Sequence, residues 1–239
     1  MTEAGELDLA AITAALEQGT PAPLPYTLRD MANDAVGLLD ALGIEAAHLV
    51  GISMGGNIAQ LVAIDYPQRV RSLTSIGADS ANRALPLVAD PEAFATVPPP
   101  PAPGDKAAFI EYQIVSERVK ASPAYPPPEP ALRQRVVRTV ERAYDPAGVV
   151  RQQVVTLVGH YERDSHRRAN LGQITAPTAI VQGAADPLQP LASAQDLAAT
   201  IPGAELFVIP GLGHDLPPPL APLFASAIER VATRSAAGA

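Results

Sequence analysis

A serine, an aspartate and a histidine stand where they could together break an acyl bond. Ser53 is the centre of a G-x-S-x-G pattern, residues 51–55, while Asp186 and His214 lie far along the chain. A serine hydroxyl is a weak nucleophile, so it needs a base to take its proton and an acid to orient that base. His214 can be the base and Asp186 the acid. The backbone N–H of Met54 would face the oxyanion that forms during attack.

The position of the serine pattern predicts a tight turn between a strand and a helix. A short apolar run ends at residues 48–50, and a helical pattern over 57–66 follows. At such a turn the serine takes a strained backbone and its neighbours crowd it. We expect Gly51 and Gly55 to remove the side chains that would clash. Ser53 would then stand at the top of a sheet, at the N-terminus of a helix.

Two later apolar runs predict the strands that carry the acid and the base. Residues 177–183 form a buried strand pattern that precedes Asp186, and residues 204–210 form another that precedes His214. The chain order is therefore serine, aspartate, histidine. Asp79 follows the strand pattern that ends at residue 76, so it is the alternative acid.

Four stretches of sequence carry a resemblance to a known family: "HLVGISMGG", "YPQRVRSL", "PTAIVQGAADPL" and "IPGLGHDLP". Together they resemble the α/β-hydrolase superfamily, and most closely its small serine esterases, which include polyketide methylesterase-like members. The resemblance implies an α/β fold with a mostly parallel sheet and a helical cap insertion. It implies Ser53 as nucleophile, Asp186 as acid, His214 as base and Met54 as oxyanion donor, and Asp79 is the acid position of some members.

Each of these residues also has a purely structural interpretation. Ser53 can be a small residue in a tight turn, Asp186 a turn residue before a proline, and His214 a loop histidine bonded to the backbone. The other three histidines are expected to be structural or exposed. They are His48, His160 and His166.

The middle of the chain differs from both ends. Residues 1–78 and 177–239 read as the hydrolase core, while residues 79–176 contain no convincing strand pattern and many prolines. Three helical patterns in this insertion predict a cap over the active site; the alternative is a helical excursion with no substrate role. Their apolar stripes are Ala108, Tyr112, Val115 and Val119; Leu132, Val136, Val140 and Ala143; and Val150, Val154, Leu157 and Tyr161.

The chain departs from the family at its beginning. Ser53 comes early, and residues 1–26 contain no β-rich run and no His-Gly pair, so we expect the family's first strands and second oxyanion donor to be missing. We therefore expect the strand near 47–52 to be an exposed sheet edge through which chains can self-associate. Whether Met1 is the natural start is left open.

Composition excludes several function classes. The net charge of −8 and only two lysines argue against nucleic acid or anionic membranes as partners. The absence of cysteine excludes disulfides and cysteine-based metal sites and fits a cytoplasmic protein. No metal or organic cofactor is expected. The sequence thus predicts a serine hydrolase of a small carboxylic ester or similar acyl compound; the alternative is a truncated or non-catalytic relative that binds a small molecule without turnover.

Overall fold

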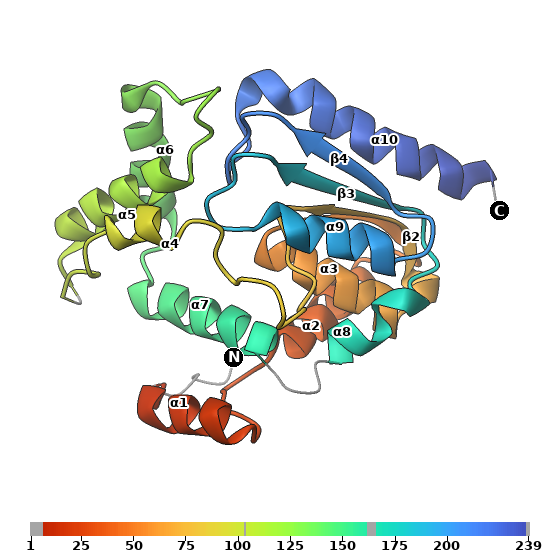
Figure 1. Ribbon diagram of the computed structural model, residues 1–239, viewed down its shortest axis with the longest axis horizontal. Helices are drawn as coiled ribbons and strands as arrows, with labels where there is room; N and C mark the ends of the chain where they lie inside the picture. Colours follow the sequence, from red (N-terminus) through yellow and green to blue (C-terminus); the bar gives the residue numbers. More distant parts are fainter. Residues whose placement is uncertain (1–6, 103, 162–165, 238–239) are drawn as a thin grey trace.

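Four parallel strands form the sheet at the centre of the computed structural model, which describes residues 7–102, 104–161 and 166–237 (Figure 1). The strands lie in the order β1-β2-β3-β4, and each neighbouring pair is parallel. They are β1 (Ala47–Ile52), β2 (Val70–Ile76), β3 (Thr178–Gly183) and β4 (Glu205–Ile209). The predicted α/β fold with a parallel sheet is confirmed.

Helices cover both faces of this sheet. Helices α2 (Leu28–Ala41), α3 (Met54–Asp65) and α9 (Leu191–Thr200) lie on one face, and α10 (Ala221–Ala237) packs on β2 and β3 from the other (Figure 1). Successive side chains of a strand point to opposite faces, so β3 serves both layers. Its Ile180 belongs to the cluster beneath α3 and α9, whereas Val181 belongs to the cluster beneath α10.

The helix that leads to β1 begins where its sequence predicts. The Thr27 hydroxyl accepts a hydrogen bond from the Asp30 N–H, and the Asp30 carboxylate accepts one from the Thr27 N–H at 2.8 Å. This reciprocal capping box satisfies two donors that a helix start otherwise leaves free. The remaining short elements are α1 (Leu9–Gln18), which precedes the sheet, and three 3-10 turns: Pro67–Arg69 before β2, Leu171–Gln173 before β3 and Pro218–Leu220 after β4.

The segment between β2 and β3 is helical, and its described residues contain no strand. Its first helices lie beyond the carboxyl ends of the strands, to the left in Figure 1. The segment contains α4 (Pro91–Ala95), α5 (Lys106–Lys120), α6 (Glu129–Arg142), α7 (Pro146–Tyr161) and α8 (His166–Asn170).

Only one of the three predicted apolar stripes in this segment is right in most of its members. In α6, Leu132, Val136 and Val140 are buried as predicted, against Phe109 and Ile114 of α5. Of the predicted α5 stripe, Tyr112 packs against this cluster, but the buried residues of α5 are Phe109 and Ile114, which the stripe did not include.

The third stripe is also wrong for the described side chains. Val155 and Val158 of α7 are buried, while the predicted Val150 and Leu157 are each 38% exposed. The cause is that α7 packs against α2 of the hydrolase core, so Val155 joins the main core cluster rather than a separate cap core. The predicted Tyr161 side chain lies outside what the structure describes.

Strand β1 forms one edge of the sheet, as predicted. It pairs with β2 on one side, and the described residues before it form helices and turns without a strand. Since α10 packs mainly on β2 and β3, one face of β1 also stays open. Val50 is 47% exposed and Ile52 is 43% exposed on that face.

In the described part of the chain, no helix has both the length and the apolar character needed to cross a membrane.

Candidate active site

The turn from β1 into α3 gives Ser53 a backbone that L-residues rarely adopt. Its φ is 53° and its ψ is −123°, between a strand that ends at Ile52 and a helix that begins at Met54. A non-glycine residue in such a region costs about 1–3 kcal/mol and tends to mark a functional site. The Ser53 N–H donates to the Ile76 carbonyl at 2.8 Å, which ties the turn to β2.

Two glycines make this turn possible, and one of them was not predicted. A Cβ at Gly51 would lie 2.2 Å from the Gly55 carbonyl oxygen, and a Cβ at Gly56 would lie 2.6 Å from the Ala78 Cβ. A Cβ at Gly55 would meet nothing within 4 Å. The expectation that Gly55 relieves a clash is therefore wrong, because it is Gly56 that packs against the loop after β2.

The helix after the turn offers a positive end to an anion. Met54 is the first residue of α3, so its N–H has no acceptor within the helix. The α3 dipole adds partial positive charge at the same point. The Ser53 side chain is half-buried, and Ser53 directly precedes Met54 in the chain. The site can thus stabilise negative charge that develops beside the serine.

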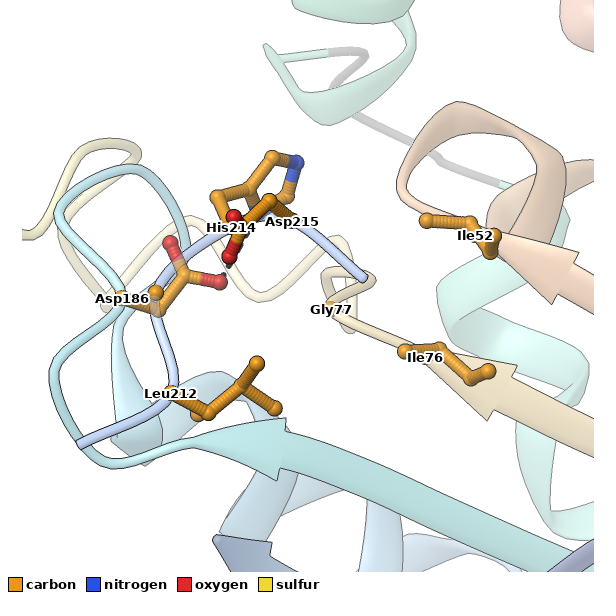
Figure 2. A pocket seen from close by; sticks show the side chains of 9 residues that line it. Ile52, Ile76, Gly77, Asp186, Leu212, His214 and Asp215 are labelled. Atoms are coloured by element: carbon orange, nitrogen blue, oxygen red, sulfur yellow. Dashed lines mark hydrogen bonds and ion pairs between the residues drawn. The ribbon is translucent and has the colours of Figure 1, made fainter. Parts of the chain in front are cut away.

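The loops after β3 and β4 bring the aspartate and the histidine together (Figure 2). The distance from His214 Nδ1 to Asp186 Oδ2 is 2.8 Å, and their side chains are 7% and 1% exposed. Asp186 Oδ1 accepts the N–H groups of Leu188 and Gln189, each at 2.8 Å. Gln182 donates to Oδ2 at 3.2 Å. These hydrogen bonds fix the orientation of the carboxylate, with Oδ2 facing the imidazole.

This contact fixes the direction of the histidine ring. With Nδ1–H donating to the carboxylate, Nε2 is left to accept a proton from another group. Gly77 lies beneath the ring, where an added Cβ would come within 3.3 Å of His214 Cε1. Gly77 also has a φ of 55°, so both its backbone and the ring above it favour glycine. The sequence analysis did not predict a role for Gly77 or Gln182. Gly77 could have been found from its position directly after the strand that ends at Ile76.

A small pocket lies at the carboxyl ends of all four strands, and Figure 2 shows its lining. Ile52, Ile76 and Leu212 supply apolar walls, and His214 and Asp186 supply the polar side. Ser53 follows directly on Ile52. The structure contains no hydrogen bond between the Ser53 hydroxyl and His214, both of which are described. Such contacts are often long before substrate binds.

The structure pairs Asp79 with an arginine rather than with a histidine. Asp79 is 2% exposed, and its Oδ1 pairs with Arg167 Nη2 at 2.7 Å. Its Oδ2 accepts from the Asn57 side chain at 2.6 Å, and Oδ1 also accepts the Ala81 N–H. Asp186 is therefore the acid that contacts His214, and Asp79 belongs to a buried ion pair that the sequence analysis did not predict.

Two of the remaining histidines bond to other residues. The His48 Nδ1 lies 2.8 Å from the Ser72 hydroxyl, and the His166 Nε2 lies 2.6 Å from Asp65. The side chain of His160 lies outside what the structure describes. Among the described residues, no three histidine, aspartate or glutamate side chains are grouped closely enough to hold a metal ion.

Comparison with known proteins agrees with this geometry. A family model described as alpha/beta hydrolase fold matches residues 17–217. The chain belongs to the α/β-hydrolase family. The prediction of membership in this family of hydrolase enzymes is therefore confirmed.

Curated relatives and solved structures show what the chain is similar to. It is 30% identical over 214 residues to rhodomycin D methylesterase DauP of Streptomyces sp. (strain C5), covering 81% of this chain and 69% of that protein. It is 31% identical to rhodomycin D methylesterase DnrP of Streptomyces peucetius, with the same coverage. The meta-cleavage product hydrolase CumD of Pseudomonas fluorescens IP01 has a TM-score of 0.60 at 20% identity, covering 94% of this chain and 82% of that chain, and shows the fold alone.

Proposed function

We propose that the chain is a serine hydrolase that cleaves small carboxylic esters. The observation that carries the proposal is the buried hydrogen bond between Asp186 and His214. It lies at the carboxyl ends of the strands, where Ser53 has its strained backbone. Two relatives with 30% and 31% identity are named methylesterases. We therefore assign methyl esters of carboxylic acids as the first substrate class to test.

In the proposed reaction, the Ser53 oxygen attacks the ester carbonyl while His214 Nε2 takes the hydroxyl proton. Asp186 stabilises the imidazolium, and the Met54 N–H donates to the oxyanion. The carbon–oxygen bond to the alcohol then breaks, and His214 returns the proton to that alcohol. Water repeats the sequence on the acyl-enzyme and releases the acid and free Ser53. We assign no second oxyanion donor, no metal and no organic cofactor.

The helical segment between the strands is proposed to act as the cap that shapes substrate access. It comprises residues 79–176, between the core parts 1–78 and 177–239. Its α5 ends beside the loop that carries His214, because the His214 N–H donates to the Lys120 carbonyl at 2.8 Å. A cytoplasmic location remains a prediction from composition.

The first test is hydrolysis of p-nitrophenyl and methyl esters by the full chain. Replacing Ser53 with alanine is expected to lower kcat by about 10⁶, as loss of a triad nucleophile does. Ser226→Ala, which makes the same change on the exposed side of α10, is the control and should hydrolyse like the parent. Equal rates in Ser53→Ala and the parent would contradict the proposal. A folded parent that binds ester analogues without turnover would support the non-catalytic alternative.

We also propose that copies of this chain associate through the β1 edge. The strand leaves N–H and C=O groups without a neighbouring strand, beside the exposed side chains of Val50 and Ile52. Sedimentation velocity should show dimers or larger species for the parent and fewer for Val50→Lys. Val208→Lys is the control, since Val208 is 41% exposed on the opposite edge strand. A parent that sediments as a monomer at all concentrations would contradict this proposal.

A further inference from the structure

Residues 211–215 form the part of the loop after β4 that carries His214, and we call them the histidine loop. Ser122, which follows α5, makes hydrogen bonds to this loop on both sides of His214. The Ser122 hydroxyl accepts a hydrogen bond from the Gly213 N–H at 2.8 Å and donates one to Asp215 Oδ1. The Ser122 N–H donates to the same carboxylate oxygen at 3.1 Å. One side chain from the cap segment thus bonds to the residue before His214 and to the residue after it.

Backbone contacts reinforce this junction. The His214 N–H donates to the Lys120 carbonyl at 2.8 Å, and the Ala124 N–H donates to the Gly211 carbonyl at 3.3 Å. The two segments leave no room for another side chain. A Cβ at Gly213 would lie 2.6 Å from the Lys120 oxygen, and a Cβ at Gly211 would lie 2.3 Å from the Ala124 Cβ.

The Ser122 hydroxyl, which makes two hydrogen bonds, is buried, so the junction requires a hydroxyl group at position 122. Ser122 is 0% exposed, so its hydroxyl is the hydrogen-bond partner that bulk water does not supply at this position. A buried N–H that loses its acceptor cannot regain a hydrogen bond without moving. The expected response to loss of the hydroxyl is therefore displacement of Gly213 and its neighbour His214.

We propose that Ser122 is a positioning residue for His214, so that the cap segment sets the geometry of the catalytic base. This inference rests on the proposed function. His214 must reach the Ser53 hydroxyl with Nε2 while Nδ1 stays on Asp186, and this double contact tolerates little displacement of the ring. A misplacement of about 1 Å by a distant mutation can lower the rate 10²-fold.

The test compares Ser122→Ala with Ser116→Ala, which makes the same change within α5 at a serine whose side chain has no hydrogen bond to residues 211–215 among the described residues. Ser122→Ala should lower kcat by about 10- to 100-fold with KM unchanged. Ser116→Ala should match the parent. An unchanged kcat, or a raised KM with unchanged kcat, in folded Ser122→Ala would overturn the inference.

Two further variants keep the test decisive if Ser122→Ala does not fold. Asp215→Ala removes the acceptor of the Ser122 hydroxyl, whereas Asp215→Asn keeps an oxygen at that position. The inference predicts a larger loss of kcat for Asp215→Ala than for Asp215→Asn. Equal losses in both would show that the carboxylate charge, not the hydrogen bond to Ser122, matters, and would overturn the inference.

Hydrogen exchange gives a readout that does not depend on hydrolysis. Peptides that contain residues 211–215 should exchange faster in Ser122→Ala than in the parent, with no change in Ser116→Ala. If the parent hydrolyses no ester but this difference is present, the proposed function fails and Ser122 still positions the loop. Unchanged exchange in these peptides would overturn the inference, whatever the activity.

Discussion

Replacing Asp186 with asparagine is expected to lower kcat by about 10⁴ while the fold is kept. The carboxylate accepts the His214 Nδ1–H at 2.8 Å and is itself held by two backbone N–H groups. An asparagine side chain can offer its NH₂ group to Nδ1, which favours the wrong imidazole tautomer and leaves Nε2 unable to accept the serine proton. Steady-state hydrolysis of a p-nitrophenyl ester, normalised to folded protein, measures the loss.

The matched control for this change is Asp79→Asn. Asp79 is also a buried aspartate after a strand, but it pairs with Arg167 at 2.7 Å. Its replacement should reduce kcat per folded molecule far less than Asp186→Asn does. The reverse ranking would assign the acid role to Asp79 and would contradict the geometry described above.

Replacing Arg167 with methionine is expected to lower the free energy of unfolding by about 3–5 kcal/mol, because it removes one partner of the buried Arg167–Asp79 ion pair. Arg167 is 3% exposed and donates to Asp79, to Gln60 Oε1 at 2.7 Å and to Asn57 Oδ1 at 3.2 Å. These contacts join α8 to α3 and to the loop after β2. Urea unfolding followed by circular dichroism gives the difference directly.

Arg133→Met is the control for this substitution. Arg133 pairs with Glu111 at 2.7 Å, and their side chains are 48% and 58% exposed. Hydrogen bonds from Arg133 lower the pKa of Glu111, yet water screens this exposed pair, so its loss should lower the free energy of unfolding far less than loss of Arg167 does. Equal destabilisation by the two substitutions would show that the Arg167 pair contributes no more than a surface pair.

The sequence predicted where Ser53, Asp186 and His214 lie relative to the strands because the signals are local. The glycine-serine pattern lies between a strand and a helix, and Asp186 and His214 each follow a strand. Parallel strands bring their carboxyl ends to one edge of the sheet, so residues that directly follow these strands lie along that edge. The strand positions alone could not distinguish Asp186 from Asp79, whereas the side-chain contacts place Asp186 on His214 and Asp79 on Arg167.

Contacts that depend on tertiary packing could not be predicted. Arg167 reaches Asp79 across 88 residues, and Ser122 reaches Asp215 across 93, without a motif at either end. The face that α7 buries depends on α2 lying beside it, which apolar spacing does not reveal. Gly56 was missed for the same reason, since its neighbour is Ala78 of a separate loop.

The most direct test of the central claim is labelling by a fluorophosphonate, which reacts with an activated serine hydroxyl. Intact-mass and peptide mass spectrometry should find a single adduct on Ser53. The adduct should disappear in both Ser53→Ala and His214→Ala, because the hydroxyl needs the base to react. Folded protein that stays unlabelled over hours, or an adduct on another residue, would contradict the account of Ser53 as a nucleophile activated by His214.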